Sequence, residues 1–106
     1  MSKYLIEATY TADGVKGVLK EGGSARRAAV EQLIKAAGGT LESYYFVFGD
    51  DDVIAVVDLP DNATMAAVSL AITAAGGATT AVRVLLSPEE IDTAANKTVE
   101  YRAPGR

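Results

Sequence analysis

The segment from Leu41 to Pro60, LESYYFVFGDDDVIAVVDLP, limits the possible folds more than any other part of the chain. It predicts two strands, Leu41–Phe48 and Val53–Leu59, joined by an acidic turn, because aromatic and β-branched residues favour strands and a proline closes the second one. The central residues of both strands are apolar without alternation. Since such strands need cover on both faces, we expect helices on one face of the sheet and a second copy of the chain on the other.

Two more strands flank this pair in the sequence. Lys3–Tyr10 alternates weakly and predicts the first strand, and the β-rich run Thr79–Leu86 predicts the fourth. Val99–Arg106 contains a proline and a glycine and is expected to be an extended tail.

Four helical segments are predicted from capping residues and apolar spacing. Gly14 and Gly17 weaken the first segment by about 1 kcal/mol each relative to Ala, and the first two segments form either one bent helix or two. The first segment is capped by Thr11 or Asp13 and breaks at Gly22 and Gly23, and the second, Ala25–Ala37, is capped by Ser24. The third is capped by Asp61 or Asn62 and ends at Gly76 and Gly77. The fourth is a short helix from Pro88 to about Lys97, capped by Ser87.

The resulting order, strand, helix, strand, strand, helix, strand and a terminal helix, is the split β-α-β arrangement of ferredoxin-like α+β domains. Right-handed crossovers then give an antiparallel sheet in the order 4-1-3-2 with both main helices on one face. We expect residues 1–106 to form one such domain, because its length is that of a single domain. Two open sheet faces packed together would make a dimeric α+β barrel.

The composition excludes several classes of function. The net charge is −4, which opposes a dedicated nucleic-acid binder, and the chain has no Cys and no His. Thiolate chemistry, histidine general bases and the usual haem and zinc ligands are therefore excluded, so we expect no cofactor and no metal. No signal peptide or membrane span is recognised in the sequence, and we expect a cytoplasmic protein.

Several contiguous motifs resemble the GYD-domain family. They are Tyr4-Leu5-Ile6, GVKGVLKEGG from Gly14, Ala25-Arg26-Arg27, GGTLESYYFVFG from Gly38, Val57-Asp58-Leu59-Pro60-Asp61-Asn62 and Tyr101-Arg102-Ala103-Pro104-Gly105. The resemblance implies a dimeric α+β barrel, a group that includes cofactor-free oxygenases, haem enzymes, isomerases and plain ligand-binding or assembly modules; haem enzymes with a histidine ligand are excluded here because the chain has no His. The family's pattern of glycine, any residue, aromatic and aspartate falls on Gly49-Asp50-Asp51-Asp52, where Asp51 replaces the aromatic.

Four residues are candidates for binding a ligand: Glu7, Tyr10, Tyr45 and Arg83. Glu7 and Arg83 lie in predicted neighbouring strands and can pair across the sheet, either as a structural ion pair or as part of a site. The tyrosines can line a cavity for a small apolar ligand, or they can fill the core and the dimer interface.

Each of two polar clusters can be interpreted either as a binding site or as an ordinary part of the surface. Asp50, Asp51 and Asp52 can bind a hard cation, but they lack the ligand spacing of a calcium loop and fit a solvated turn better. Ser24, Arg26 and Arg27 follow two glycines at a helix start and are anion-binding candidates, or ordinary surface residues.

The sequence thus favours a homo-oligomeric binding or assembly module. The alternative is a cofactor-independent enzyme, an oxygenase or isomerase acting on a small apolar or aromatic substrate, with Tyr45, Arg83 and Glu7 as its polar groups. Such an enzyme predicts a pocket of about 300 Å³ or more into which Tyr or Arg side chains point.

Overall fold

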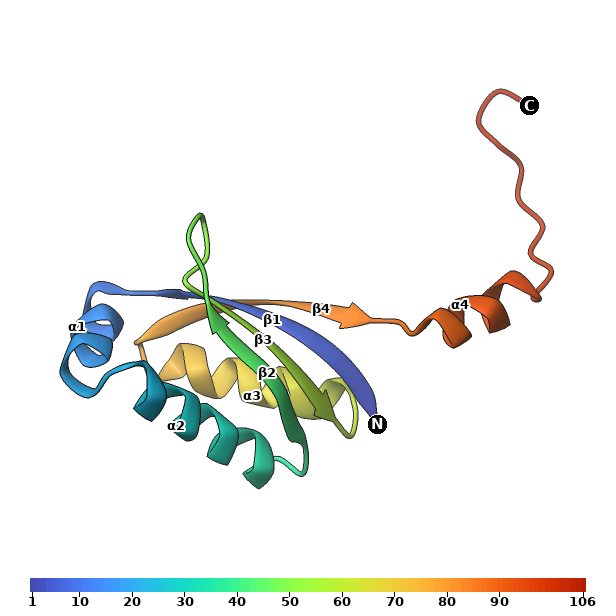
Figure 1. The fold of residues 1–106 in the computed structure, drawn as a ribbon. Coiled ribbons are helices and arrows are strands. Elements are labelled where there is room, and N and C mark those ends of the chain that lie inside the picture. Colours follow the sequence, from blue (N-terminus) through green and yellow to red (C-terminus); the bar gives the residue numbers. More distant parts are fainter.

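The computed structural model describes the whole chain, Met1 to Arg106 (Figure 1). It contains four strands and four helices. Their bounds are β1 (Ser2–Tyr10), α1 (Ala12–Glu21), α2 (Gly23–Ala36), β2 (Thr40–Phe46), β3 (Val53–Leu59), α3 (Asn62–Ala74), β4 (Ala78–Leu85) and α4 (Pro88–Ala95).

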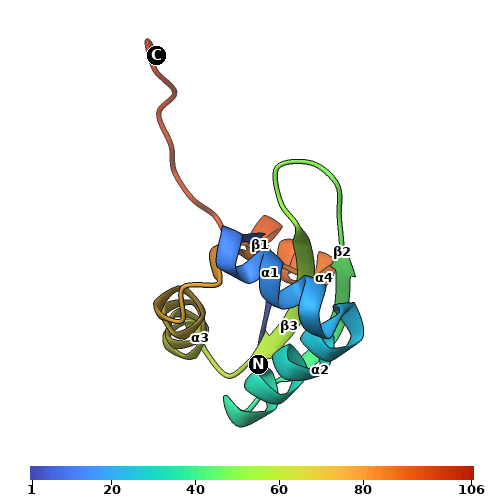
Figure 2. The ribbon, with the colours of Figure 1, turned by 90° about the vertical axis from the view of Figure 1, so that its left-hand side faces the viewer.

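The four strands form one antiparallel sheet in the order β2-β3-β1-β4. Read from its other edge this is the predicted order 4-1-3-2, and the ferredoxin-like α+β fold is confirmed. The helices α1, α2 and α3 all lie on one side of the sheet, which leaves its other side without helical cover (Figures 1 and 2).

The core lies between the sheet and helices α2 and α3. Along β3 every second side chain from Val53 to Leu59 is buried, which matches the two-residue period of a strand. Tyr4 is buried too, and its hydroxyl donates to Asn62 Oδ1 at 2.6 Å, so the polar group of a core tyrosine is satisfied. The core cluster comprises Tyr4, Ile6, Ile34, Leu41, Ala55, Val57, Leu59, Met65 and Val68.

Strand β2 contains an irregularity that the sequence did not reveal. The pairing with β3 shifts between Leu41 and Ser43, so Glu42 is an extra residue, as in a β-bulge. The shift puts Tyr44 on the same side as the buried Leu41, opposite Ala55, whereas simple alternation would have placed them on opposite sides.

The predicted strand end at Phe48 is wrong, because β2 ends at Phe46. The backbone N–H of Val47 instead donates to the carbonyl of Asp52, 3.0 Å away, and closes the loop between β2 and β3. Phe48 is fully exposed in this loop. The predicted fourth strand is shifted by one residue at each end, and α4 stops at Ala95, since Asn96 is its C-cap.

Three of the four predicted N-caps are confirmed. Thr11, Asp61 and Ser87 each accept a hydrogen bond from a backbone N–H in the first turn of α1, α3 and α4. Ser24 as the cap of α2 is wrong: that helix begins two residues earlier than predicted, at Gly23 after the N-cap Gly22, and has no side-chain cap. Gly22, with φ 86°, separates α1 from α2, so the two segments are distinct helices.

The C-terminal arm, defined as residues 86–106, extends away from the rest of the molecule (Figure 1). It contains α4 followed by residues without helix or strand, and α4 buries none of its side chains. The radius of gyration is 17.0 Å, against about 13 Å for a compact chain of this length. The arm therefore accounts for an elongated shape.

Candidate functional sites on the two sides of the sheet

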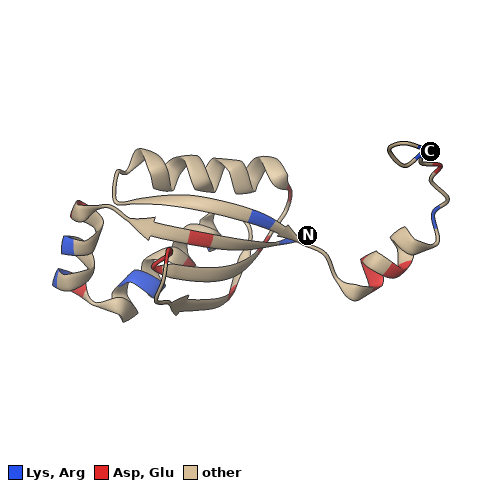
Figure 3. Ribbon diagram, turned by 90° about the horizontal axis from the view of Figure 1, so that it is seen from above, with Lys and Arg blue, Asp and Glu red and all other residues tan.

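The helix-free face is the side of the sheet that no helix covers. Its residues follow from the strand register: Lys3, Leu5, Glu7 and Thr9 of β1, Thr40, Ser43 and Tyr45 of β2, Ile54, Val56 and Asp58 of β3, and Thr79, Ala81, Arg83 and Leu85 of β4. Besides Glu7 and Arg83, its charged residues include Lys3, which pairs with Glu42 and, at 3.2 Å, with Asp58. Most of the strand length seen from this side is uncharged (Figure 3). Leu5, Ile54 and Val56 at its centre are partly exposed, and the Tyr45 side chain is 69% exposed.

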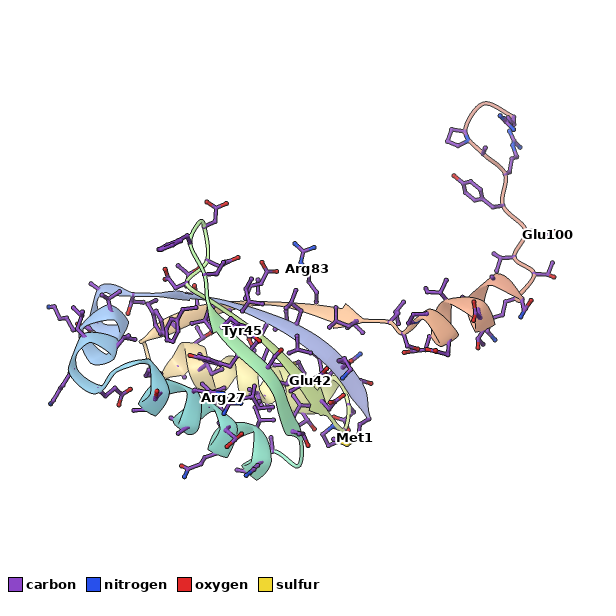
Figure 4. The ribbon with its side chains drawn as sticks, in the orientation of Figure 1. Met1, Arg27, Glu42, Tyr45, Arg83 and Glu100 are labelled. Carbon is purple, nitrogen blue, oxygen red and sulfur yellow. The ribbon has the colours of Figure 1, made fainter.

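The predicted pair of Glu7 and Arg83 forms on this face. Arg83 Nε donates to Glu7 Oε1 at 3.0 Å, from β4 to the neighbouring β1. Arg83 lies directly opposite Leu5, so the ion pair is a diagonal contact. The Arg83 side chain points away from the helices and is largely exposed (Figure 4).

Asp51, the residue that replaces the family's aromatic, contacts Glu7. A hydrogen bond with Asp51 and, second, one with Arg83 lower the pKa of the Glu7 carboxyl, while the contact with Glu7 raises the pKa of Asp51. The contact therefore shifts the two carboxyl pKa values in opposite directions. Thr9 Oγ1 donates to Asp51 Oδ1 at 3.4 Å and holds the turn against β1.

Asp52, the last residue of the family's pattern, fixes the loop to the central strand. Its carboxylate accepts from the backbone N–H of Tyr10 at 2.8 Å, and its own N–H donates to the carbonyl of Ala8 at 2.9 Å. Gly49 has φ 119°, a conformation suited to glycine. No group of three or more acidic residues in the chain is arranged to hold a metal ion.

The helix-side pocket lies on the other side of the sheet and has a volume of about 340 Å³. It is bounded by α1, α2, α3 and the ends of β1 and β4. Gly14 and Gly17 of α1, together with Ala71 of α3 and Ala75 directly after that helix, form walls of small residues. The other lining residues are Tyr10, Glu21, Arg26, Leu33, Ile72, Gly77 and Ala78.

Polar side chains gather at one end of this pocket. Arg26 Nη1 donates to Glu21 Oε1 at 3.1 Å, and the hydroxyls of Tyr10 and Tyr44 are 3.3 Å apart. Burial would lower the pKa of Arg26, but hydrogen bonds with Glu21 and Tyr10 raise it overall. Burial, and then the contact with Tyr10, raise the pKa of Tyr44. The set therefore combines one ion pair with two phenol hydroxyls that lie side by side.

The predicted site residues fall into two groups. Glu7, Tyr45 and Arg83 lie on the helix-free face, while Tyr10 and Arg26, predicted for different roles, meet in the helix-side pocket. Arg27 instead pairs with Glu31 one turn along α2, at 3.5 Å, and Ser24 is exposed. Figure 4 shows Arg27 and Tyr45 on α2 and β2.

Sequence reasoning missed Glu21 as part of this pocket. It stands five residues before Arg26, on the other side of the helix break at Gly22. The sequence does contain a signal for this pair: two opposite charges stand on either side of a predicted helix break. The chain changes direction at such a break, and this can bring the two side chains together.

The fold and the loop pattern place the protein among ferredoxin-like α+β domains. Comparison with protein families matches residues 4–95 to the GYD domain, so the chain belongs to the GYD domain family. Comparison with curated proteins and with solved structures gave no match. None of the helices is long and apolar enough to cross a membrane.

Proposed function

We propose that this GYD domain is a self-associating module whose helix-free face packs on a second copy of the chain. The observation that supports the proposal most directly is the apolar centre of that face, formed by Leu5, Ile54 and Val56 beside the exposed ring of Tyr45. A contiguous apolar surface of this kind marks an interaction site. Two like copies would also bring two Glu7 and Arg83 pairs into the same interface.

The total exposed surface supports the same proposal. The chain exposes 7341 Å², whereas a compact monomer of its mass of 11.0 kDa exposes about 5,600 Å². The difference is about twice the roughly 800 Å² per partner that a stable interface buries. Only 11 of 106 residues are buried, so a single copy has a small core.

Two exposed segments extend the surface available to a second copy. Phe48 is fully exposed in the loop between β2 and β3, which rises on the helix-free side (Figure 1). The C-terminal arm exposes Leu86, Ile91, Val99 and Tyr101. An eight-residue helix such as α4 is marginal in water on its own, and packing on a second copy would stabilise it.

Binding and assembly fit this geometry better than the enzymatic alternative. The polar groups expected for an enzyme, Tyr45, Arg83 and Glu7, lie on an open sheet face, and the pocket of the expected size is lined by Tyr10 and Arg26 instead. The two sets lie on opposite sides of the sheet and do not form one reaction site.

Light scattering at micromolar concentration tests self-association. We expect a mass of at least twice the 11.0 kDa of the chain. The variant Val56→Lys places a charge at the centre of the face and should be a folded monomer by circular dichroism. The control Leu70→Lys, at a 71% exposed position on α3, should keep the oligomeric mass. A monomeric wild-type chain, or an unchanged mass for Val56→Lys, would contradict the proposal.

A further inference from the structure

The helix-side pocket has one wall with a glycine that the fold itself does not require. Gly17 lies in the interior of α1, and a Cβ built there meets no atom within 4 Å. Its backbone does not have a positive φ. Glycine in a helix interior is less favourable than alanine, so the chain gives up helix stability here without a packing or backbone reason. What the glycine does provide is open space in the pocket.

Gly14, one turn earlier on the same wall, shows the contrast. A Cβ at that position would lie 1.9 Å from the carbonyl oxygen of Gly77. The same carbonyl accepts from the N–H of Thr11 at 3.0 Å, and the Thr11 hydroxyl donates to the carbonyl of Gly76 at 2.8 Å. Gly14 is thus explained by the close contact of α1 with the turn before β4, and this contact holds the wall in place.

The polar end of the pocket defines what kind of ligand fits. Glu21 and Arg26 neutralise each other, and Tyr10 supplies an uncharged hydroxyl. A charged ligand would have to compete with an existing ion pair, whereas an uncharged hydroxyl can donate to Glu21 and accept from Arg26 or Tyr10. The rest of the lining, Leu33 and Ile72 with the alanine and glycine walls, is apolar.

The volume limits the ligand's size. At about 340 Å³ the pocket is at the small end of the range of about 300 to 1,000 Å³ for ligand sites. Walls of glycine and alanine admit a flat body between α1 and α3. We propose that the helix-side pocket binds an uncharged one- or two-ring aromatic alcohol, with its ring between α1 and α3 and its hydroxyl at Tyr10, Glu21 and Arg26.

Calorimetric titration with 2-naphthol as the probe tests this site. We expect saturable binding of one molecule per chain, with weaker binding of naphthalene, which lacks the hydroxyl, and of 2-naphthoate, which is charged. The variant Arg26→Met keeps most of the apolar stem and should weaken 2-naphthol binding by about two- to tenfold, with no effect on naphthalene.

Two variants fill the pocket from opposite walls. Gly17→Leu and Ala71→Leu should each weaken 2-naphthol binding at least tenfold while thermal unfolding remains cooperative. The matched control Lys16→Leu adds the same side chain next to Gly17 but outside the pocket lining, and it should bind as the wild type does.

Three results would overturn the proposal: no saturable binding of 2-naphthol, tighter binding of 2-naphthoate, or unchanged binding by both pocket-filling variants. The pocket and the helix-free face lie on opposite sides of the sheet. Recording the mass by light scattering in the same samples therefore separates a failure of ligand binding from a failure of self-association.

Discussion

At the scale of single residues, the contact between Glu7 and Asp51 is the most unusual feature of the chain. Two carboxyl groups meet on the helix-free face, where each alone would be ionised at neutral pH. The lowered pKa of Glu7 and the raised pKa of Asp51 have the same origin, since the contact between the two side chains is the largest cause of each shift. Asp51 therefore contacts both Glu7 and Thr9 of β1 and holds the loop against that strand.

Removing Asp51 should change the titration of Glu7. In Asp51→Ala, Glu7 loses the main cause of its lowered pKa, and its pKa should rise towards the ordinary value of 4.5. Arg83→Met should raise it as well, because Arg83 is the next cause. Carbon-13 NMR of the Glu7 carboxyl over a pH titration measures both shifts.

The control for this titration is Asp50→Ala. Asp50 is next to Asp51 in the loop, but its contact with Thr9 is through its backbone carbonyl, so the Glu7 pKa should stay as it is in the wild type. All variants are compared in the same oligomeric state. A Glu7 pKa that does not move in Asp51→Ala would show that the carboxyl contact is absent in solution.

At the scale of secondary-structure elements, α1 provides two glycines for which the same substitution should have opposite effects. Gly17→Ala should stabilise the protein by about 0.5 to 1 kcal/mol, because it removes the helix penalty at an open position. Gly14→Ala should destabilise it by about 1 to 3 kcal/mol, since its Cβ would overlap the carbonyl of Gly77.

Urea unfolding followed by circular dichroism measures both changes. The two positions are three residues apart on one helix and receive the same methyl group, so each is the control for the other. Stability changes of the same sign would mean that α1 does not pack against the turn at Gly77 as described.

Most of the elements were predictable, because local residues decide them. The caps Thr11, Asp61 and Ser87 each bond to the first turn of their own helix. The apolar, β-branched run of β3 favours a strand by its residue types alone. Ser24 was misjudged as a cap because Gly22 already ends one helix and starts the next. Local propensity alone does not distinguish a cap from a first-turn residue.

The pocket was less predictable because it depends on distant contacts. The extra residue Glu42 changes which aromatic rings of β2 face the helices, and nothing in the local sequence marks that shift. Tyr10 and Arg26 were each predicted to bind a ligand, but only the folded chain, with Gly14 of α1 against the turn at Gly77, shows that they line one pocket. The Glu7 and Arg83 pair was predictable since strand order alone makes them neighbours.

At the scale of the whole molecule, the C-terminal arm is expected to strengthen self-association. A chain that ends at Leu85 should keep its sheet and its three remaining helices, because α4 buries no side chain. If the proposed self-association holds, this truncated chain should dissociate at least tenfold more readily, since burying one side chain such as Ile91 contributes about 1.5 to 3 kcal/mol. A dilution series followed by light scattering compares the truncated and complete chains.

Three point substitutions in the arm, Ile91→Ser, Val99→Ser and Tyr101→Ser, keep its length and remove its apolar groups, so they separate the effect of the apolar contacts from that of chain length. If the truncated chain associates as tightly as the complete one, the arm does not take part in the interface.

The way the arm is attached also affects how the protein should be labelled and immobilised. The arm leaves the sheet at the end of β4. An affinity tag or fluorescent fusion placed after Arg106 would therefore be attached to the segment that is expected to contact the second copy. Met1 is 74% exposed, and β1 begins at the next residue. A fusion there would need a flexible spacer so that it does not disturb the start of this central strand, but it would leave the arm free.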